Sequence, residues 1–197
     1  MFYQHKVLLS VTALSLILLG CSKRDQVKKD EIERIQVELK PSGLYISGDK
    51  IDRRADLNIS LVKQGFIFRD SKTSSEGSTV YQSQLWQGDK LLLTFYGQQA
   101  GSQQSLQSRF TLINVENKEV FVSEGGEIGD GFSQVIDNLE LCKAGVEEAS
   151  GLVICQKSQS SPFYYIFDPQ WNGPDSVIPP KGVLHSSSVV KIQWREN

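Results

Sequence analysis

Short runs of alternating apolar and polar residues, separated by turn residues, are the feature of this sequence that most restricts its fold. Residues 35–40 alternate strictly between the two kinds of side chain, and Pro41, Ser42 and Gly43 follow them. Such alternation is typical of a β-strand with one buried face, and the three residues after it predict a turn. Short strands joined by tight turns predict an antiparallel β-meander.

Further runs of this composition predict strands at residues 66–69, 79–86, 90–96, 109–115, 119–123, 152–156, 163–168 and 189–195. Their connections have turn chemistry: residues 71–78 are polar, Gly88-Asp89 is tight and residues 116–118 are short. In the last run, Val190, Ile192 and Trp194 are expected to face the core. Residues 97–108 are rich in glutamine and predict a mobile hairpin tip.

Two segments have apolar residues at helical spacing. The first face consists of Ile51, Ala55, Ile59 and Val62, with Asp49 as the expected N-cap and Gly65 as the C-cap. The second consists of Phe132, Val135, Ile136 and Leu139, with Asp130 as the expected cap. The predicted fold is mainly β (α+β): an antiparallel β-sandwich-like domain with two helices packed on it.

The N-terminus has the pattern of a bacterial lipoprotein signal peptide. An apolar run from Val7 to Leu19 ends at Leu18-Leu19-Gly20-Cys21. This run is shorter than the roughly 20 residues of a membrane-spanning helix, which disfavours an uncleaved anchor. We therefore expect a signal peptide at 1–20, an acylated (palmitate-bearing) Cys21 with a charged tether at 21–34, and a single periplasmic β-rich domain at 35–197.

The lipid anchor and the net charge indicate where the protein resides and which partners it lacks. Several acyl chains hold a protein on a bilayer far more firmly than one chain does. Ser22 is not the aspartate that retains lipoproteins in the inner membrane, so we expect the outer membrane, facing the periplasm. Residues 1–20 contain one of the 21 basic side chains and none of the 23 acidic ones, so the remaining chain has a net negative charge. A negative charge disfavours nucleic-acid binding.

Two cysteines remain once Cys21 is acylated. Outside the reducing cytosol, Cys142 and Cys155 are expected to form a disulfide. A two-cysteine metal site would need further ligands nearby, and His185 is the only histidine after residue 20. The disulfide is therefore the favoured interpretation, and we expect no metal and no cofactor.

Several groups with possible chemistry also have plainer interpretations. Glycines at 125, 126, 129 and 131 fit neither a P-loop nor a dinucleotide motif. His185 precedes three serines, but adjacent residues do not make a catalytic triad. Glu124, Glu127 and Asp130 could bind calcium, although capping or solvation is commoner. An aromatic platform of Tyr164, Tyr165 and Trp171 is a further possibility, against burial in the core. We expect no catalytic residue.

The last third of the chain carries three groups of residues in a distinctive order. Residues 128–133 are followed by Cys142, then by Cys155, and then by residues 171–175 (Trp-Asn-Gly-Pro-Asp) and the closing 190–195. In this order they resemble the sigma-E (RpoE)-regulated lipoprotein family of enteric bacteria, which has no assigned activity. The matching positions, expected to be structural, are Gly129, Phe132, Trp171, Gly173, Pro174, Pro179, Trp194 and Arg195.

The resemblance implies a β-sandwich-like domain, two family cysteines and a link to envelope stress. The favoured hypothesis is a non-enzymatic, membrane-anchored periplasmic lipoprotein of unknown biochemical activity that binds an envelope protein or peptidoglycan, or serves a structural role. The alternatives are an inhibitor of lysozyme or a protease, presenting residues 97–108, and a hydrolase that uses His185.

Overall fold

The computed structural model describes residues 36–52, 61, 65–75, 78–97 and 109–196. They belong to one compact unit, residues 35–197. The predicted signal peptide, Cys21 and the tether lie outside the described residues. Within the described part, the chain is mainly β, as predicted, with two sheets and few helices, and no helix there is long and apolar enough to cross a membrane.

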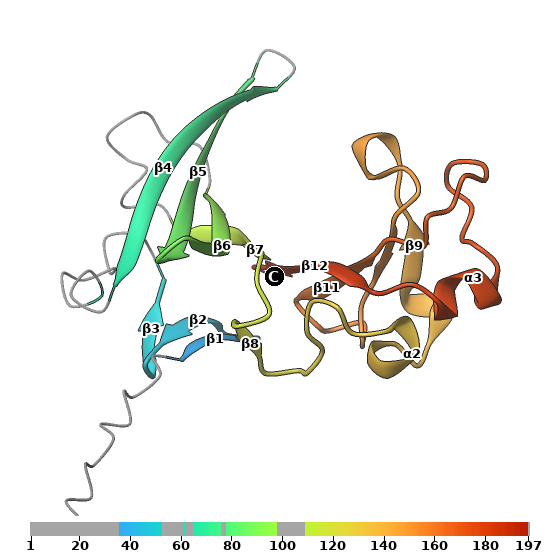
Figure 1. Cartoon of the computed structure of the whole chain (residues 1–197), viewed down its shortest axis with the longest axis horizontal. Coiled ribbons are helices and arrows are strands. Elements are labelled where there is room, and N and C mark those ends of the chain that lie inside the picture. The colour runs from blue at the N-terminus through green and yellow to red at the C-terminus, as the bar shows by residue number, and fades with distance from the viewer. Residues whose placement is uncertain (1–35, 53–60, 62–64, 76–77, 98–108, 197) are drawn as a thin grey trace, which may run out of the picture. The chain divides into compact units, whose positions relative to one another are not determined.

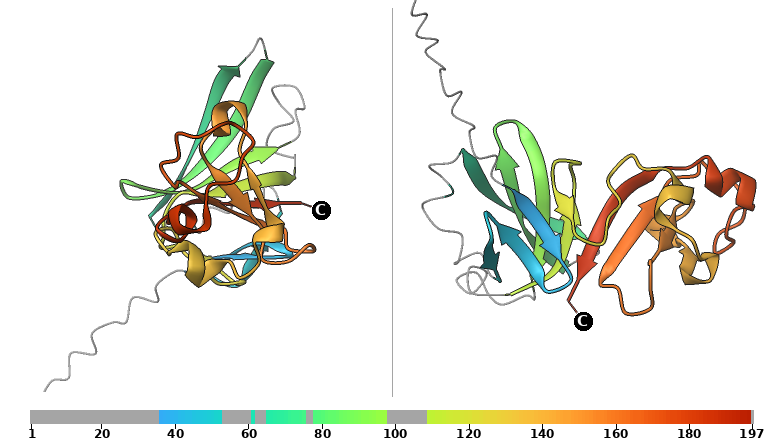
Figure 2. Two further views of the ribbon diagram at one scale, coloured as in Figure 1. Left: turned by 90° about the vertical axis from the view of Figure 1, so that its right-hand side faces the viewer. Right: turned by 90° about the horizontal axis from the view of Figure 1, so that it is seen from below.

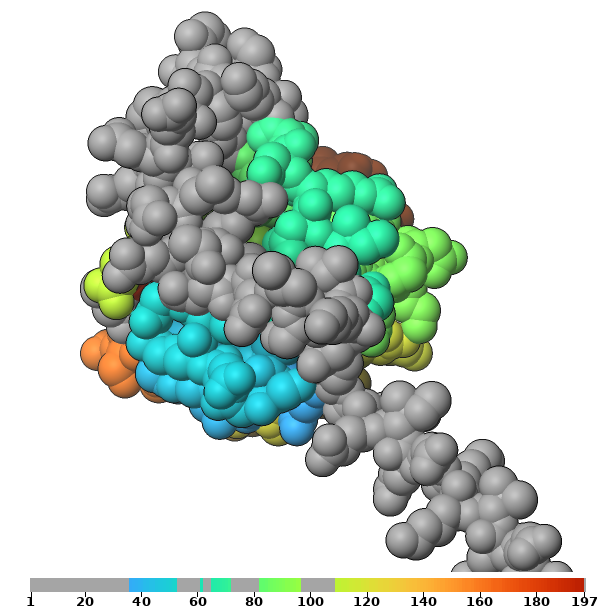
Figure 3. Space-filling view, turned by 90° about the vertical axis from the view of Figure 1, so that its left-hand side faces the viewer, coloured from blue at the N-terminus to red at the C-terminus, as the bar shows by residue number. Residues whose placement is uncertain are grey.

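The smaller sheet has four strands in the order β3-β2-β1-β8 (Figure 1). Its strands are β1 (Val37–Lys40), β2 (Gly43–Ile46), β3 (Asp49–Ile51) and β8 (Phe121–Val122). Alternate residues of β1 are buried, as the alternation predicts. Figure 3 shows β1 to β3 in blue, on the same face of the molecule as β4 in green.

The larger sheet has eight strands in the order β4-β5-β6-β7-β12-β11-β10-β9, all paired antiparallel. Figure 2 shows this sheet from two further sides, with β4 to β6 in green and β9 to β12 in orange and red. Its strands are β4 (Phe66–Ser75), β5 (Ser78–Gln87), β6 (Lys90–Gly97), β7 (Phe110–Val115), β9 (Cys142–Ala144), β10 (Val153–Cys155), β11 (Phe163–Phe167) and β12 (Val189–Arg195).

One apolar core joins the two sheets. Leu39 and Leu44 of the smaller sheet belong to the same buried cluster as Phe95 and Ile192 of the larger one. The indole of Trp194 also donates a hydrogen bond to the Pro41 carbonyl, 3.2 Å away, between β12 and the β1–β2 turn. The arrangement is consistent with an open β-sandwich.

The helices whose full length lies within the described residues are short. They are α2 (Phe132–Val135), α3 (Lys181–His185) and the 3-10 turns η2 (Leu139–Leu141) and η3 (Glu147–Ala149). The second predicted helix ends after one turn, and its N-cap is Gly131 instead of Asp130. The Asp130 carboxylate accepts a hydrogen bond from the Glu127 backbone N–H instead. Phe132 packs on Phe167 of β11, at a ring-centroid distance of 4.8 Å.

The predicted start of the first helix is wrong. Asp49 and Ile51, taken as its cap and first apolar residue, lie in β3 and pair with β2. Leu61 is helical and buried, and the other residues of the predicted helix from 53 to 64 lie outside the described residues. A three-residue strand has too few residues to show a period, so local spacing could not separate it from a helix.

Two predicted connections also differ. Residues 71–75 extend β4 and pair with β5 from Ser78 onward, although they are polar. The backbone groups of a hairpin satisfy each other, so polar side chains do not prevent pairing. The predicted strand at 119–123 is reduced to β8, which pairs parallel with β1 instead of continuing the meander. Parallel partners are distant in sequence, and a local pattern does not reveal them.

The last strand has the predicted bounds, but one of its side chains faces the other way. Ile192 and Trp194 are buried as expected, whereas Val190 is 45% exposed and Val189 is buried. Between Ile166 and Phe167 of β11 the register shifts, so that Phe167 pairs with Val189. This bulge inserts one extra residue in β12 and reverses the facing of residues before it.

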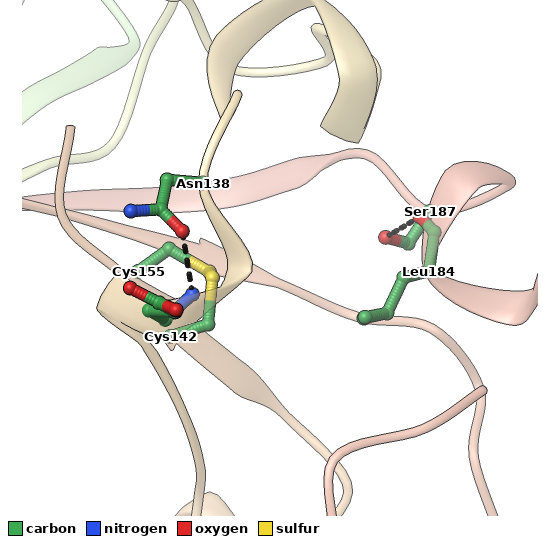
Figure 4. Close-up of a disulfide and its surroundings, with 6 residues drawn as sticks. Asn138, Cys142, Cys155, Leu184 and Ser187 are labelled. Carbon is green, nitrogen blue, oxygen red and sulfur yellow. Dashed lines mark hydrogen bonds between the residues drawn. A yellow bond between two sulfur atoms is a disulfide. The ribbon is translucent and has the colours of Figure 1, made fainter. Parts of the chain in front are cut away.

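The predicted disulfide between Cys142 and Cys155 is present, and both residues are buried. They lie directly opposite each other in the β9–β10 hairpin. Figure 4 shows the bridge beside the turn where the Asn138 side chain accepts a hydrogen bond from the Glu140 backbone N–H, at 2.9 Å. In the same view, the Ser187 hydroxyl donates to the Leu184 carbonyl, 2.6 Å away.

Candidate functional site

A pocket of about 220 Å³ lies where the smaller sheet meets the ends of β7 and β12. The β1–β2 turn, β3 with Asp52, the start of β7 and the end of β12 all contribute to its walls. Its lining residues are Pro41, Ser42, Gly43, Leu44, Lys50, Ile51, Asp52, Arg109, Phe110, Ile113, Trp194 and Glu196. The pocket thus combines segments that are far apart in the sequence.

The apolar part of this lining comes from the core. Leu44, Ile51, Phe110, Ile113 and Trp194 are all at most 7% exposed, so the pocket ends on packed side chains. Trp194 is held by its hydrogen bond to the Pro41 carbonyl. A rigid apolar surface of this kind can accept an apolar group without having to be ordered first.

The charged part of the lining consists of two ion pairs. Lys50 lies 2.9 Å from Asp52, and Arg109 lies 3.6 Å from Glu196. Exposed ion pairs of this kind contribute only about 0–1 kcal/mol to stability. A charged ligand can therefore exchange contacts with them at little cost.

Backbone hydrogen bonds hold these charged residues next to one another. The Phe110 N–H donates to the Asp52 carbonyl, 3.2 Å away, which places Asp52 beside the start of β7. The Glu196 N–H donates to the Thr111 carbonyl, 3.0 Å away, on the other side of the same strand. The side chains of Lys50, Asp52, Arg109 and Glu196 thus give the pocket lining two positive and two negative charges.

The Gly-rich segment after β8 is tied to β11 by a second polar cluster. The Ser161 hydroxyl donates to the Glu124 carboxylate at 2.6 Å, and the Lys157 ammonium donates to the Glu124 backbone carbonyl at 2.8 Å. The Tyr165 hydroxyl donates to the Gly125 carbonyl at 2.6 Å. These hydrogen bonds connect the segment at Glu124 and Gly125 to the residues before and within β11.

Burial strongly raises the pKa of the Tyr165 phenol, and the nearby Glu124 carboxylate raises the pKa further. Tyr165 therefore stays neutral and acts as a hydrogen-bond donor at physiological pH. Gly126 lies against this ring: a Cβ atom at that position would lie 2.9 Å from Cε1 of Tyr165. The close approach explains why the segment needs glycine there.

The carboxylates and the histidine considered for catalysis or metal binding lie apart from the pocket lining. Glu124 and Asp130 accept the hydrogen bonds described above. His185 is exposed at the end of α3, and its ring stacks on Phe132 at a centroid distance of 6.1 Å. Within the described residues, no three His, Cys, Asp or Glu side chains are grouped to hold a metal ion.

The aromatic platform considered for Tyr164, Tyr165 and Trp171 does not form, because Tyr165 is fully buried. The Arg195 guanidinium covers the face of Tyr164, 4.3 Å from the ring centroid. Cation–π contacts at exposed sites contribute about 0.5–1 kcal/mol. Tyr164 and Arg195 therefore pack against each other on adjacent strands of the larger sheet, β11 and β12.

The turn at residues 171–174 packs on itself and on the disulfide hairpin. The Trp171 ring lies so close to Gly173 that a Cβ atom there would be 2.1 Å from the ring. Pro174 and Pro179 lie with Trp171 against Gly145 and Gly151 of the turn between β9 and β10. Gly129 has a φ of +98°, and its N–H donates to the Val189 carbonyl. These motif residues thus contact the disulfide hairpin, one another and β12.

Sequence reasoning missed the pocket. Of the motif residues, only Trp194 lines it. Its charged residues look like ordinary surface residues in the sequence, and only the pairing of β7 with β12 brings Arg109 and Glu196 together. Residues 97–108, the loop considered for an inhibitor, lie outside the described residues except for Gly97.

The comparisons with known proteins agree with this fold and assign no activity. The crystal structure of the uncharacterized protein YfeY from Escherichia coli is similar over 82% of this chain and 99% of that chain, with a TM-score of 0.58 and 19% identity. At this identity the likeness shows the fold alone. No curated protein matches the chain. The model of a family described as "Protein of unknown function (DUF1131)" matches residues 53–196, so the chain belongs to the DUF1131 family.

Proposed function

We propose that the protein is a lipid-anchored component of the bacterial cell envelope that binds a small envelope ligand in the pocket between its two sheets, without catalysing a reaction. The pocket is the observation that carries the binding role. An apolar floor and a charged border are the usual elements of a small-molecule site. The sequence-based links to envelope stress and to sigma-E regulation belong to the same proposal.

Two observations support the envelope location. The sequence ending at Cys21 has the pattern of a lipoprotein signal peptide. The disulfide between Cys142 and Cys155 is typical of proteins outside the reducing cytosol. The outer membrane, with the domain facing the periplasm, is the location that Ser22 favours.

The lining of the pocket indicates which ligand chemistry fits. The floor of Phe110, Ile113 and Trp194 suits a small apolar group. The two basic and two acidic side chains of the border suit a ligand with both a carboxylate and an ammonium group, because each finds a side chain of opposite charge there. Short peptides cut from peptidoglycan have these groups, and they are the first ligands to test.

A non-catalytic role is supported by what the candidate reactive groups contact. Ser161 and Glu124 bond to each other and join two segments of the fold. His185 is exposed and its ring packs on the apolar ring of Phe132, a contact that does not orient an imidazole as a general base. These contacts stabilise structure, and they favour binding over the hydrolase hypothesis.

Thermal unfolding of the full chain with soluble peptidoglycan peptides tests the binding role. A ligand at about 100 times its Kd stabilises the folded state by about 2.7 kcal/mol, which raises the melting temperature. We expect this rise in the natural protein and its loss in the double variant Lys50→Ala/Arg109→Ala. The matched control is Lys118→Ala, an exposed lysine outside the pocket lining, which should keep the rise.

Two results would contradict the pocket as the binding site. One is an equal rise in melting temperature for the double variant and for the natural protein. The other is the absence of any rise with zwitterionic peptides while purely apolar or purely anionic compounds stabilise the protein, because the charged border would then have no role.

A further inference from the structure

We propose that the two turns at residues 145–151 and 168–180 form a docking surface for a basic, apolar segment of a partner protein. We call these two segments the acidic turns. The first connects β9 to β10, and the second connects β11 to α3 (Figure 1). This surface shares no residue with the pocket described above, and the proposal does not depend on that pocket.

Three exposed apolar side chains lie on the acidic turns. Val146 is 51% exposed, Val177 is 48% exposed and Ile178 is 37% exposed. The two turns touch each other, because Gly145 and Val177 line the same small depression and the Ser150 hydroxyl bonds to the Asp175 carboxylate. Single exposed apolar residues are ordinary on a protein surface, whereas exposed apolar residues on two turns that touch each other indicate an interaction site.

The acidic turns are held in one shape before any partner binds. The Gly145 N–H donates to the Leu152 carbonyl at 2.8 Å, in the same hairpin that the disulfide crosslinks. A Cβ atom at Gly145 would overlap the Ala149 carbonyl, and one at Gly173 would overlap the Trp171 ring. A surface that is already ordered binds with a smaller loss of conformational entropy.

The charge of the acidic turns indicates the chemistry of the partner segment. Together they carry Glu147, Glu148, Asp168 and Asp175, and they contain no lysine, arginine or histidine. Anionic lipids and nucleic acids would be repelled by these carboxylates, whereas lysine or arginine next to apolar side chains would complement them. The chemistry therefore selects a protein segment with basic and apolar residues over a membrane surface.

Peptide binding to the full chain in a neutral detergent tests this proposal. We expect a fluorescent amphipathic Leu/Lys peptide to bind saturably, and added salt to weaken the binding. Two variants should each lower the affinity about tenfold: Glu147→Gln/Glu148→Gln and Val177→Ser/Ile178→Ser. The control is Val190→Ser, since Val190 is 45% exposed on β12, outside the acidic turns.

Photo-crosslinking from position 177 in intact cells separates a protein partner from a lipid. We expect an adduct whose crosslinked peptide contains lysine or arginine together with apolar residues, and whose yield falls in Glu147→Gln/Glu148→Gln. The proposal is overturned by a lipid adduct or an acidic crosslinked peptide. It is equally overturned by a Leu/Lys peptide that does not bind, that binds no better than a Leu/Glu peptide, or that binds the turn variants as well as the natural protein.

Discussion

Two glycines in the segment after β8 allow a matched test of packing against backbone strain. Gly126 has a φ of +93° and Gly129 a φ of +98°, both in the region that favours glycine. A Cβ atom at Gly126 would lie 2.9 Å from the Tyr165 ring and 3.1 Å from Cγ1 of Val135. A Cβ atom at Gly129 would meet nothing within 4 Å. The substitutions Gly126→Ala and Gly129→Ala therefore differ mainly in steric overlap.

The expected magnitudes follow from these contacts. Backbone strain with φ above zero costs an alanine about 1–2 kcal/mol. Replacing glycine by alanine also lowers the conformational entropy of the unfolded chain, which offsets about 0.4–1 kcal/mol of that cost. Gly129→Ala should thus destabilise by about 1 kcal/mol. Gly126→Ala adds an overpacking cost of about 1–3 kcal/mol and should destabilise by about 2–4 kcal/mol.

Urea unfolding of both variants and the natural protein, followed by circular dichroism, measures this difference. The reasoning predicts a clearly lower unfolding midpoint for Gly126→Ala than for Gly129→Ala. Equal midpoints would refute it, because the Tyr165 ring and Val135 would then not hold the Gly-rich segment as closely as the structure shows.

Three further predictions concern the disulfide, a buried phenol and the histidine. The double variant Cys142→Ala/Cys155→Ala should lose about 3 kcal/mol of unfolding free energy in urea, since the bridge closes a loop with a sequence separation of 13 residues; an unchanged midpoint would contradict this. Because burial and Glu124 raise the pKa of Tyr165, its unfolded form ionises first, near pH 10. The stability it contributes is complete below that pH and falls as the pH rises above it. Tyr165→Phe should therefore cost about 1 kcal/mol at pH 7 for the lost hydrogen bond and lessen the alkaline decline; an identical pH profile would count against the argument. His185→Ala should change the unfolding free energy by less than about 0.5 kcal/mol and leave complementation of a deletion strain intact, whereas loss of function in the folded variant would favour the hydrolase hypothesis.

The sequence predicted those parts of the fold in which local pattern and pairing agree. The bounds of β12 were right because Ile192 and Trp194 face the core in a regular register. The predicted direction of the Val190 side chain was wrong because the bulge interrupts the alternation of side chains along β12. The bulge depends on the pairing with β11, which the local sequence does not reveal. The Cys142–Cys155 hairpin was predictable, since the two cysteines are close in the sequence and the N-terminal pattern favours a compartment in which disulfides form.

The candidate site depended on contacts that only the folded chain provides. Trp194 stood out in the sequence as a motif residue, but its place in the pocket comes from the hydrogen bond to Pro41 of the other sheet. Lys50 lies in β3 and Arg109 directly before β7, and nothing in their sequence neighbourhoods relates them. The acidic turns were missed for the same reason: their exposed valines become recognisable only when the fold shows that the core does not use them.

Labelling with an alkyne analogue of palmitate tests whether the protein is a lipid-anchored component of the envelope. Cells producing the natural chain or Cys21→Ser are grown with the analogue, and the protein is then isolated. Label is expected on the natural chain and on Cys142→Ala/Cys155→Ala, but not on Cys21→Ser, which should accumulate as an unprocessed precursor. Label retained on Cys21→Ser, or a natural chain without label, would contradict the account.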